Sequence, residues 1–298
     1  MDGKSICAIV IVIIAIAMFV PFGSSDNVNG TSNVVVTYGE TTYNNGEYKN
    51  IVDNYFNVNN AKESVITAND VNKISSGISQ RTYNSNQIFS CAMVDLTSNN
   101  NIDIDVDSSK ITTVTPSMYK SALDSAGITK GHVKITSPVS ATGESALAGI
   151  MKSYEESTGK IIPTEVKDAA NNEIYSQAKV AENSNASADD IANMMDEVKE
   201  EVAKENTTNG QTITNIINNV ASNNNIKISD NDINVLVNSV QQTQSVQDKA
   251  SDYKNQLSSY VESGAAQSLF DRIIGFVNSI INGGNSANKI NATNFTSK

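Results

Sequence analysis

The sequence predicts an α+β fold, in which a mixed α/β domain over residues 33–159 is followed by an all-helical region over residues 163–282. Up to Gly159, short apolar runs suited to strands alternate with helical patterns, in which apolar residues recur at i, i+3, i+4 and i+7. After Pro163 the strand pattern stops, and amphipathic helical patterns follow one another. At 298 residues, with 39% hydrophobic residues, the chain is long enough to bury a sizeable core.

The best-defined local pattern begins at residue 115 with a helix. Thr115 and Pro116 are typical of a helix start, because threonine caps the first turn and proline loses no hydrogen bond there. Gly127 is typical of a helix end, where the backbone often needs a positive φ. Between them lies one apolar stripe, formed by Tyr119, Ala122, Leu123 and Ala126.

A strand and a second helix are expected to follow. Val133 and Ile135 alternate with polar residues, which predicts a strand with one buried face. The second helix is expected to be capped by Thr142, to have Ser145 at its third position and to end at Gly159. Its apolar stripe is Leu147, Ile150, Met151 and Tyr154.

The earlier part of the α/β domain contains weaker patterns. Short strands are expected at 34–37 and 64–67, and helices at 48–55 and 69–74. The best strand pair is 87–96 with 102–107, joined by the polar turn 98–101.

The helical region contains four successive apolar stripes, each typical of an amphipathic helix, at 191–202, 213–220, 233–240 and 253–261. Ser187 and Ser229 are expected to cap the first and the third of these helices. Residues 270–281 carry the most hydrophobic stripe after the N-terminal apolar run. We expect this stripe to pack on the preceding helices, with a membrane surface or a partner helix as the alternatives. Residues 283–298 are expected to be a disordered tail.

Residues 6–20 form an uninterrupted apolar run near the N-terminus. Its length is that of the apolar part of a signal peptide, and it falls short of the roughly 20 residues of a spanning helix. We therefore expect residues 1–25 to be a signal peptide or a retained N-terminal membrane anchor, and the sequence leaves both open. Both alternatives place the rest of the chain outside the cytoplasm.

The net charge of −11 argues against nucleic acid as a partner, because phosphate binding requires clustered lysine and arginine. It disfavours an anionic membrane surface for the same reason. Cys7 lies in the apolar run, so Cys91 is the single cysteine of the remaining chain and has no partner for an intramolecular disulfide. We expect Cys91 to be a buried small hydrophobic residue, and we expect no cofactor.

A resemblance to a known family is carried by VTPSMYKSALDSAGI and VKITSPVSATGESALAGIMKSYEESTGK. These runs resemble the DUF1002 family of predicted secreted proteins from bacteria and methanogenic archaea, and the likeness extends more weakly to Val36–Gly39, Ser90–Val94 and about Val246. The chain departs from the family pattern at Ala141 and in its asparagine-rich C-terminal part. The resemblance implies an exported, archaeal type of protein and implies no activity.

One weak catalytic pattern surrounds Ser145. The run Gly143-Glu144-Ser145-Ala146 half-resembles a G-x-S-x-G nucleophile elbow, but alanine follows the serine and the second glycine is missing. His132 is the single histidine and would have to act as the base. We favour the alternative, a serine in the first turn of an ordinary helix.

A weak metal-binding pattern is formed by Asp103, Asp105 and Asp107, which share one face of the predicted strand. Their oxygens would suit Ca²⁺, but the spacing lacks an EF-hand loop, so a solvated edge is favoured. His132 has no second histidine or cysteine pair with which to bind zinc. We expect a set of tyrosines to lie in the core and at its rim in preference to lining a sugar or peptide groove: Tyr38, Tyr43, Tyr48, Tyr55, Tyr83, Tyr119 and Tyr154.

The remaining pattern is a set of glycosylation sequons, at Asn29, Asn185, Asn206, Asn291 and Asn294. Together with the N-terminal segment 1–25, which we call the leader, these sequons suggest an extracytoplasmic, cell-surface-associated protein. It would be secreted or anchored to the membrane through residues 6–20. The function favoured is a non-catalytic binding or envelope module, whose partner is an envelope polymer or a surface protein. The alternative is an extracytoplasmic serine hydrolase that uses Ser145 and His132.

Overall fold

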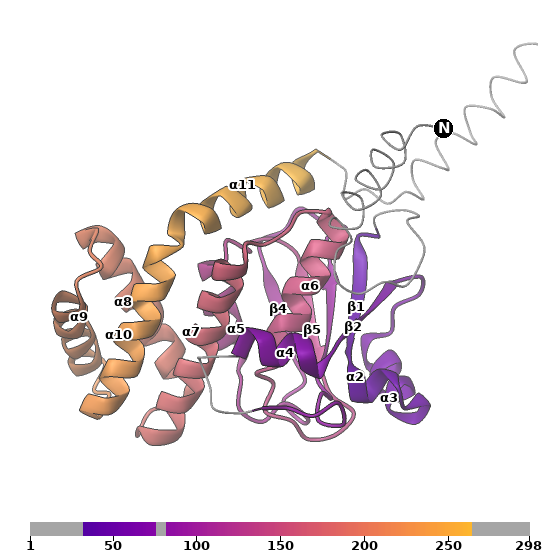
Figure 1. Cartoon of the computed structure of the whole chain (residues 1–298), viewed down its shortest axis with the longest axis horizontal. Coiled ribbons are helices and arrows are strands. Elements are labelled where there is room, and N and C mark those ends of the chain that lie inside the picture. Colours follow the sequence, from indigo (N-terminus) through magenta and orange to yellow (C-terminus); the bar gives the residue numbers. More distant parts are fainter. Residues whose placement is uncertain (1–31, 76–81, 264–298) are drawn as a thin grey trace, which may run out of the picture. The chain divides into compact units, whose positions relative to one another are not determined.

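The computed structural model describes residues 32–75 and 82–263. Its β-sheet is mixed and has five strands in the order β2-β1-β3-β5-β4 (Figure 1). β1 is parallel to β2, β4 is parallel to β5, and β3 is antiparallel to both β1 and β5. The strands are β1 Val34–Gly39, β2 Lys62–Ile66, β3 Cys91–Asp95, β4 Asp103–Val106 and β5 His132–Thr136. With the helices described below, this sheet confirms the predicted α+β class.

The predicted pairing of the strands around 87–96 and 102–107 is wrong. Both strands form, but β5 lies between them: Ala92 of β3 pairs with Ile135, and Ile104 of β4 pairs with Val133. Val133 and Ile135 are fully buried, so β5 belongs in the interior of the sheet, whereas the aspartates of β4 suit an exposed edge. A local hairpin would have left β5 at the edge.

Helices cover the two faces of the sheet unequally. α6 (Ala146–Thr158) packs on β1, β2 and β3 on one face, with α5 (Pro116–Ser125) against β4. α2 (Glu40–Tyr43) and α3 (Gly46–Phe56) lie on the other side, where Val52 and Phe56 pack against β1 and β3. α4 (Ala68–Ser75) contacts α6 and α7.

The helix that begins after Thr115 is confirmed in detail. The Thr115 hydroxyl accepts a hydrogen bond from the Met118 N–H, Pro116 is the first helical residue, and Gly127 has a φ of +75°. The second helix ends as predicted at Gly159, whose φ is +66°.

The start of α6 differs from the prediction. The helix begins at Ala146, so Ser145 is the residue before it and Thr142 is not its cap. Gly143, with a φ of +97°, turns the chain between them, and the Thr142 hydroxyl donates instead to Glu144 at 3.0 Å. The glycine breaks the helical path that a cap at Thr142 would have required.

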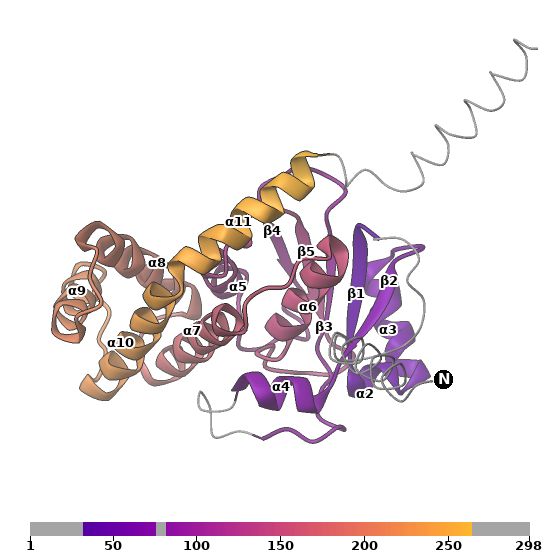
Figure 2. The same cartoon turned by 45° about the horizontal axis from the view of Figure 1, so that its top comes forward.

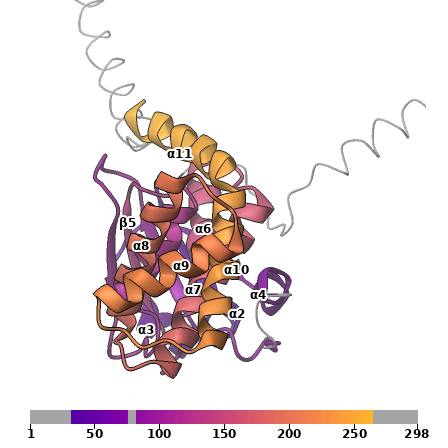
Figure 3. The same ribbon diagram turned by 90° about the vertical axis from the view of Figure 1, so that its left-hand side faces the viewer.

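The helical region consists of five helices within the described residues: α7 Thr164–Asn183, α8 Ala188–Glu205, α9 Gly210–Asn223, α10 Asp230–Ser245 and α11 Gln247–Glu262 (Figures 2 and 3). The predicted caps are confirmed, because Ser187 forms a reciprocal capping box with Asp190, and Ser229 accepts from the Asp232 N–H. α7 was not predicted as a separate element.

Two hydrophobic cores organise these helices. The larger core joins the sheet, α5 and α6 to α7 and α11, through residues such as Ile174 and Tyr253. The second core holds α8, α9 and α10 together, with Met195 and Leu236 among its members. α7 contributes to both cores, since Val180 belongs to the second.

Asparagines account for every non-glycine residue with positive φ among the described residues, namely Asn57, Asn60, Asn206 and Asn225. Asn57 and Asn206 come directly after α3 and α8, and Asn225 is the second residue after the end of α9. Asparagine tolerates the left-handed conformation better than other side chains do, so it replaces the usual glycine at helix ends. The asparagine-rich composition therefore has a local structural use.

Of the described helices, none is long and apolar enough to cross a membrane. The leader at 1–25, the stripe at 270–281, the tail at 283–298 and the sequons at Asn29, Asn291 and Asn294 all lie outside the described residues.

Candidate functional site

The predicted metal and base residues lie together on one face of β4 and β5. His132 pairs with Asp103 and Lys134 with Asp105 in the parallel register. The His132 Nε2 atom lies 3.8 Å from Asp103 Oδ2. The aspartates do share a face, as the spacing predicted. β4 is an edge strand, and the described residues contain no group of three or more His, Cys, Asp or Glu residues arranged to hold a metal ion.

Asp107 is the most enclosed of the three aspartates. Its Oδ2 accepts a hydrogen bond from the Thr136 hydroxyl at 2.7 Å, and its Oδ1 accepts from the Ser109 hydroxyl at 2.6 Å. Partial burial acts to raise the pKa of Asp107, but these hydrogen bonds outweigh burial and hold the pKa below its usual value. Asp107 therefore fixes the end of β4 and has few lone pairs left for a ligand.

The structure does not bring Ser145 and His132 together. Val133 and Ile135 pack in the larger core with Leu147 of α6, so the side chains that alternate with them, including His132, point to the other face of the sheet. Ser145 immediately precedes α6 on the core side. The sheet thus lies between the proposed nucleophile and the proposed base, which must be within hydrogen-bond reach to react.

The tyrosines are divided between the core and its rim. Tyr38, Tyr119 and Tyr154 are buried, and the hydroxyls of the last two donate to the backbone carbonyls of Gly143 and Lys130. The others are partly or largely exposed: Tyr43, Tyr48, Tyr55 and Tyr83. Because the seven lie on both sides of the sheet, they do not line one groove.

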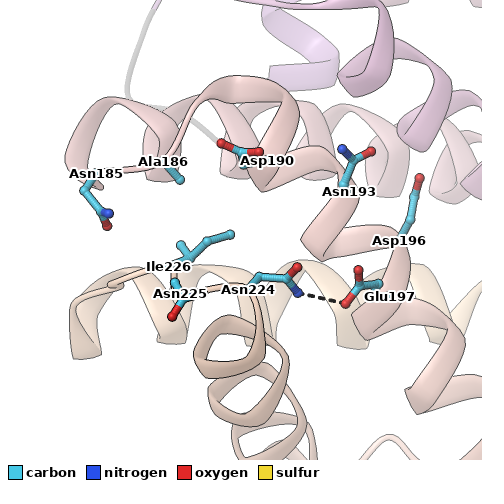
Figure 4. A pocket seen from close by; sticks show the side chains of 9 residues that line it. All are labelled: Asn185, Ala186, Asp190, Asn193, Asp196, Glu197, Asn224, Asn225 and Ile226. Carbon is cyan, nitrogen blue, oxygen red and sulfur yellow. Dashed lines mark hydrogen bonds between the residues drawn. The ribbon is translucent and has the colours of Figure 1, made fainter.

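A polar pocket of about 530 Å³ lies where the turn before α8 meets the turn after α9 (Figure 4). We call it the α8–α9 pocket. In Figure 4, Glu197 of α8 reaches Asn224 in the turn after α9, whereas the polar ends of Asp190, Asn193 and Asp196 point away from that turn. Its lining consists of Asn185, Ala186, Asp190, Asn193, Asp196, Glu197, Asn224, Asn225 and Ile226. This described lining contains four amides and three carboxylates, with no lysine or arginine.

The backbone on both sides of this pocket is fixed by local hydrogen bonds. The Asp190 carboxylate accepts from the backbone N–H and hydroxyl of Ser187 in the capping box, and these bonds lower its pKa. On the opposite side, the Ile226 N–H donates to the carbonyl of Ala221, which closes α9 with Asn225 at a φ of +56°. The pocket rim is therefore pre-formed.

Two pocket side chains are oriented by partners that leave other atoms available. The Glu197 Oε2 atom accepts from the Asn224 amide at 2.9 Å, as the dashed line in Figure 4 shows. The Asp196 Oδ1 atom lies 2.6 Å from the Ser121 hydroxyl and 3.0 Å from Lys199 Nζ, while 44% of the Asp196 side chain is exposed. Each carboxylate thus has one oxygen held by the protein and a second that can accept from a ligand.

Asp196 connects the pocket to a buried polar cluster at the junction of α5, α7, α8 and α10. We call it the Glu173 cluster; it consists of Ser121, Ser125, Glu173, Gln177, Asp196, Lys199 and Thr243. The Glu173 side chain is fully buried, and Lys199 Nζ lies 2.7 Å from its Oε1 atom. Burial acts to lower the pKa of Lys199, but Glu173 and Asp196 together raise it, so the lysine stays protonated.

The chemistry of this cluster favours a structural role. Lys199 lies 2.9 Å from the Ser121 hydroxyl, which is the separation of a serine–lysine catalytic pair. A protonated lysine, however, cannot take the serine proton, and Ser121 is completely buried. The cluster joins a helix of the α/β domain to three helices of the helical region.

Sequence reasoning missed both the pocket and the cluster. Glu173 and Lys199 stand in the apolar stripes of their helices, next to Ile174 and Val198. A charged residue at such a position is the signal that would have indicated a buried partner. The pocket residues had no comparable signal, because asparagine is abundant throughout the chain. Of the predicted sequons, Asn185 lines the pocket and Asn206 is exposed at the end of α8.

Comparisons with known proteins agree with the resemblance noted in the sequence. The chain is 28% identical over 190 residues to the "Uncharacterized protein YpuA" of Bacillus subtilis (strain 168). The match covers 60% of this chain and 64% of the Bacillus protein, which is less than two thirds of that relative's length. No solved structure matches the chain. The model of the family described as "Protein of unknown function (DUF1002)" matches residues 38–260, more than half of the chain, and the protein therefore belongs to the DUF1002 family.

Proposed function

We propose that this protein is a non-catalytic binding module of the cell surface, and that the α8–α9 pocket binds a neutral, hydroxyl-rich polymer such as an envelope glycan. The observation that carries the proposal is the lining of the pocket, in which amides and carboxylates surround a space of about 530 Å³. Amide side chains both donate and accept hydrogen bonds, and carboxylates accept them from hydroxyl groups. This volume falls within the usual range for ligand pockets.

The charge of the pocket selects among polymers. Asp190, Asp196 and Glu197 line it without a lysine or arginine among the described lining residues. A phosphorylated or sulfated chain would meet like charges there, which disfavours nucleic acid and anionic glycans. A neutral glycan carries no charge for these carboxylates to repel, and its C–H groups can contact Ala186 and Ile226.

The separation of Ser145 from His132 supports a binding role over hydrolysis. The sheet keeps the two side chains apart, and Lys199, the other candidate base near a serine, stays protonated beside Glu173. A pocket built from fixed polar side chains supports recognition without a nucleophile.

The proposed location rests on sequence features. The apolar run at residues 6–20 supports export, either as a cleaved signal peptide or as an anchor. Asn206 is exposed in the turn between α8 and α9, which suits a glycosylated surface position on a protein of archaeal type. The net charge of −11 suits a protein whose surface is exposed to solvent.

Binding is tested by titrating the full chain with neutral glucan, mannan and chito-oligosaccharides, with dextran sulfate as the anionic control. At least one neutral glycan is expected to bind, and dextran sulfate is not. Asn193→Ala combined with Glu197→Gln is expected to weaken binding about 10-fold, because each lost hydrogen bond costs about 0.5–1.5 kcal/mol.

The matched control is Asn218→Ala, an exposed asparagine of α9 outside the pocket, which is expected to leave binding unchanged. Equal losses in both variants, or binding of the sulfated polymer alone, would overturn the glycan site. Proteolysis of intact cells, followed by mass spectrometry of the mature N-terminus, tests the location separately. A protein that stays intact inside unbroken cells contradicts export.

A further inference from the structure

The sheet has an open edge along β4. Within the described part of the chain, β4 pairs with β5 alone. The N–H groups of Asp103 and Asp107 donate to carbonyl groups of β5 and of the residue before it. Because the backbone groups of successive strand residues point to opposite sides, the N–H and C=O groups of Ile104 and Val106 point away from β5. We call residues Asp103–Val106 with these outward backbone groups the β4 edge.

The two faces of the β4 edge differ in chemistry. On the outer face, the side chains of Asp103 and Asp105 are exposed. On the inner face, Ile104 and Val106 pack against the larger core but are only half-buried. A strand added beside β4 places its own side chains about 4.5–5.5 Å from these residues, alternately on the two faces. It therefore meets carboxylates on one face and incompletely covered apolar groups on the other.

The negative charge of the outer face is not neutralised by the protein. The Asp103 side chain is 79% exposed, and the group nearest in charge is His132, whose Nε2 lies 3.8 Å away. No lysine or arginine of the described residues forms an ion pair with Asp103 or Asp105. Burial raises the pKa of Tyr55 on α3, and the charges of Asp105 and Asp107 raise it further. The negative field of this face thus extends as far as α3.

The opposite edge of the sheet provides a comparison. The exposed residues of β2 carry charges of both signs, and both form ion pairs. Lys62 lies 3.0 Å from Glu156, and Glu63 lies 2.8 Å from Lys49. Uncompensated charge is therefore a property of the β4 edge and is not shared by both edges of the sheet.

We propose that the β4 edge docks an extended segment of a partner protein, added as a further strand in which lysine or arginine alternates with apolar residues. The basic side chains face Asp103 and Asp105, and the apolar side chains cover Ile104 and Val106. The backbone groups of the segment pair with the outward groups of β4. This contact goes beyond the proposed glycan site, which belongs to α8 and α9.

The same charges disfavour a second copy of this chain as the occupant. Antiparallel pairing of two β4 edges through Ile104 and Val106 would place aspartates directly opposite aspartates, and like charges at such positions are destabilising. A basic strand gains from the arrangement that repels an identical edge.

The test titrates the full chain with a fluorescein-labelled peptide in which lysine and valine alternate, and follows fluorescence anisotropy at low salt. The control peptide has the same composition, with the lysines and the valines in separate blocks. The alternating peptide is expected to bind about tenfold more tightly, because only its lysines can share one face of a strand. Equal binding of the two peptides, or no binding of the alternating one, overturns the proposal.

A pair of charge variants separates the β4 edge from the overall charge of the chain. Asp103→Asn combined with Asp105→Asn is expected to weaken binding of the alternating peptide about fivefold, since exposed ion pairs are individually weak. The matched control is Glu200→Gln combined with Glu201→Gln, which removes the same charge from exposed positions on α8 and is expected to leave binding unchanged. Equal losses in both variants show attraction by net charge alone and overturn the proposal.

A backbone variant tests strand pairing itself. Val106→Pro removes one outward N–H group, and proline is tolerated in edge strands, so the fold is expected to persist and binding to weaken about fivefold or more. Circular dichroism checks the fold. Unchanged affinity in the folded variant contradicts an added strand. A dimer of the unaltered chain that Val106→Pro dissociates in sedimentation assigns the edge to a second copy and also overturns the proposal. The peptide is unrelated to glycans, so the two sites fail independently.

Discussion

Replacement of Lys199 by methionine is expected to destabilise the protein far more than the loss of a surface ion pair would. The Glu173 side chain is fully buried, and Lys199 is its cationic partner, at 2.7 Å. Methionine matches the length of the lysine stem but leaves the carboxylate charged and uncompensated. Removing one partner of a buried pair typically costs about 3–5 kcal/mol.

The structure places the expected cost near the lower end of that range, at about 3 kcal/mol. Four neutral donors remain around the Glu173 carboxylate, namely Ser121, Ser125, Gln177 and Thr243. These hydrogen bonds stabilise the charge in part. Adding Glu173→Gln removes the buried charge altogether, so the double variant is expected to recover about 1–2 kcal/mol relative to Lys199→Met alone.

Urea unfolding followed by circular dichroism at pH 7 measures these free energies. The control is Lys120→Met, whose lysine pairs with Asp124 at 2.7 Å but is 53% exposed, and its expected cost is only about 0.3–0.5 kcal/mol. A cost below about 1 kcal/mol for Lys199→Met, together with no recovery in the double variant, would refute the idea that the pair is desolvated.

The pH dependence of stability follows from the raised pKa of Lys199. Although burial opposes the charged form, Glu173 and Asp196 raise this pKa above that of an unfolded lysine, which is about 10.4. The stabilisation is therefore fully present below that value and is lost as the pH rises through the folded pKa. The wild type is expected to lose stability in this alkaline window, and Lys199→Met is expected to lose less.

Three further predictions concern single positions. Gly127→Ala is expected to cost about 3 kcal/mol or more, because the added Cβ would clash with the Ala250 carbonyl oxygen and because the φ of +75° disfavours any side chain. Thermal unfolding measures this cost. The control is Gly46→Ala, whose added Cβ meets no atom within 4 Å and which is expected to be nearly neutral. Ser187→Ala is expected to cost about 1 kcal/mol of unfolding free energy through loss of the capping box, and Ser187→Thr to restore most of it. Burial raises the pKa of Cys91 to about 12, so a thiol reagent at pH 8 is expected to label it only in urea, and rapid labelling of the folded protein would contradict this.

The sequence determined those features that depend on neighbouring residues. The helix from Pro116 to Ser125 begins and ends at its predicted signals, because Thr115 and Gly127 act on backbone groups within one turn of themselves. The division into a sheet-containing part and a helical part was likewise visible, since the period of the apolar residues changes from the first to the second. Burial of Cys91 is also confirmed.

Tertiary structure alone decided which elements became neighbours. The sequence predicted a hairpin of β3 and β4 because these strands are consecutive in the chain. In the structure β5 lies between them, because this position buries Val133 and Ile135 against α6. α7 was not predicted because it packs against several helices and therefore buries polar as well as apolar residues, so its sequence shows no clear apolar stripe. Glu173 meets Lys199 only because α5, α7, α8 and α10 converge, and pairings across such distances in the chain follow from packing, which no local pattern encodes.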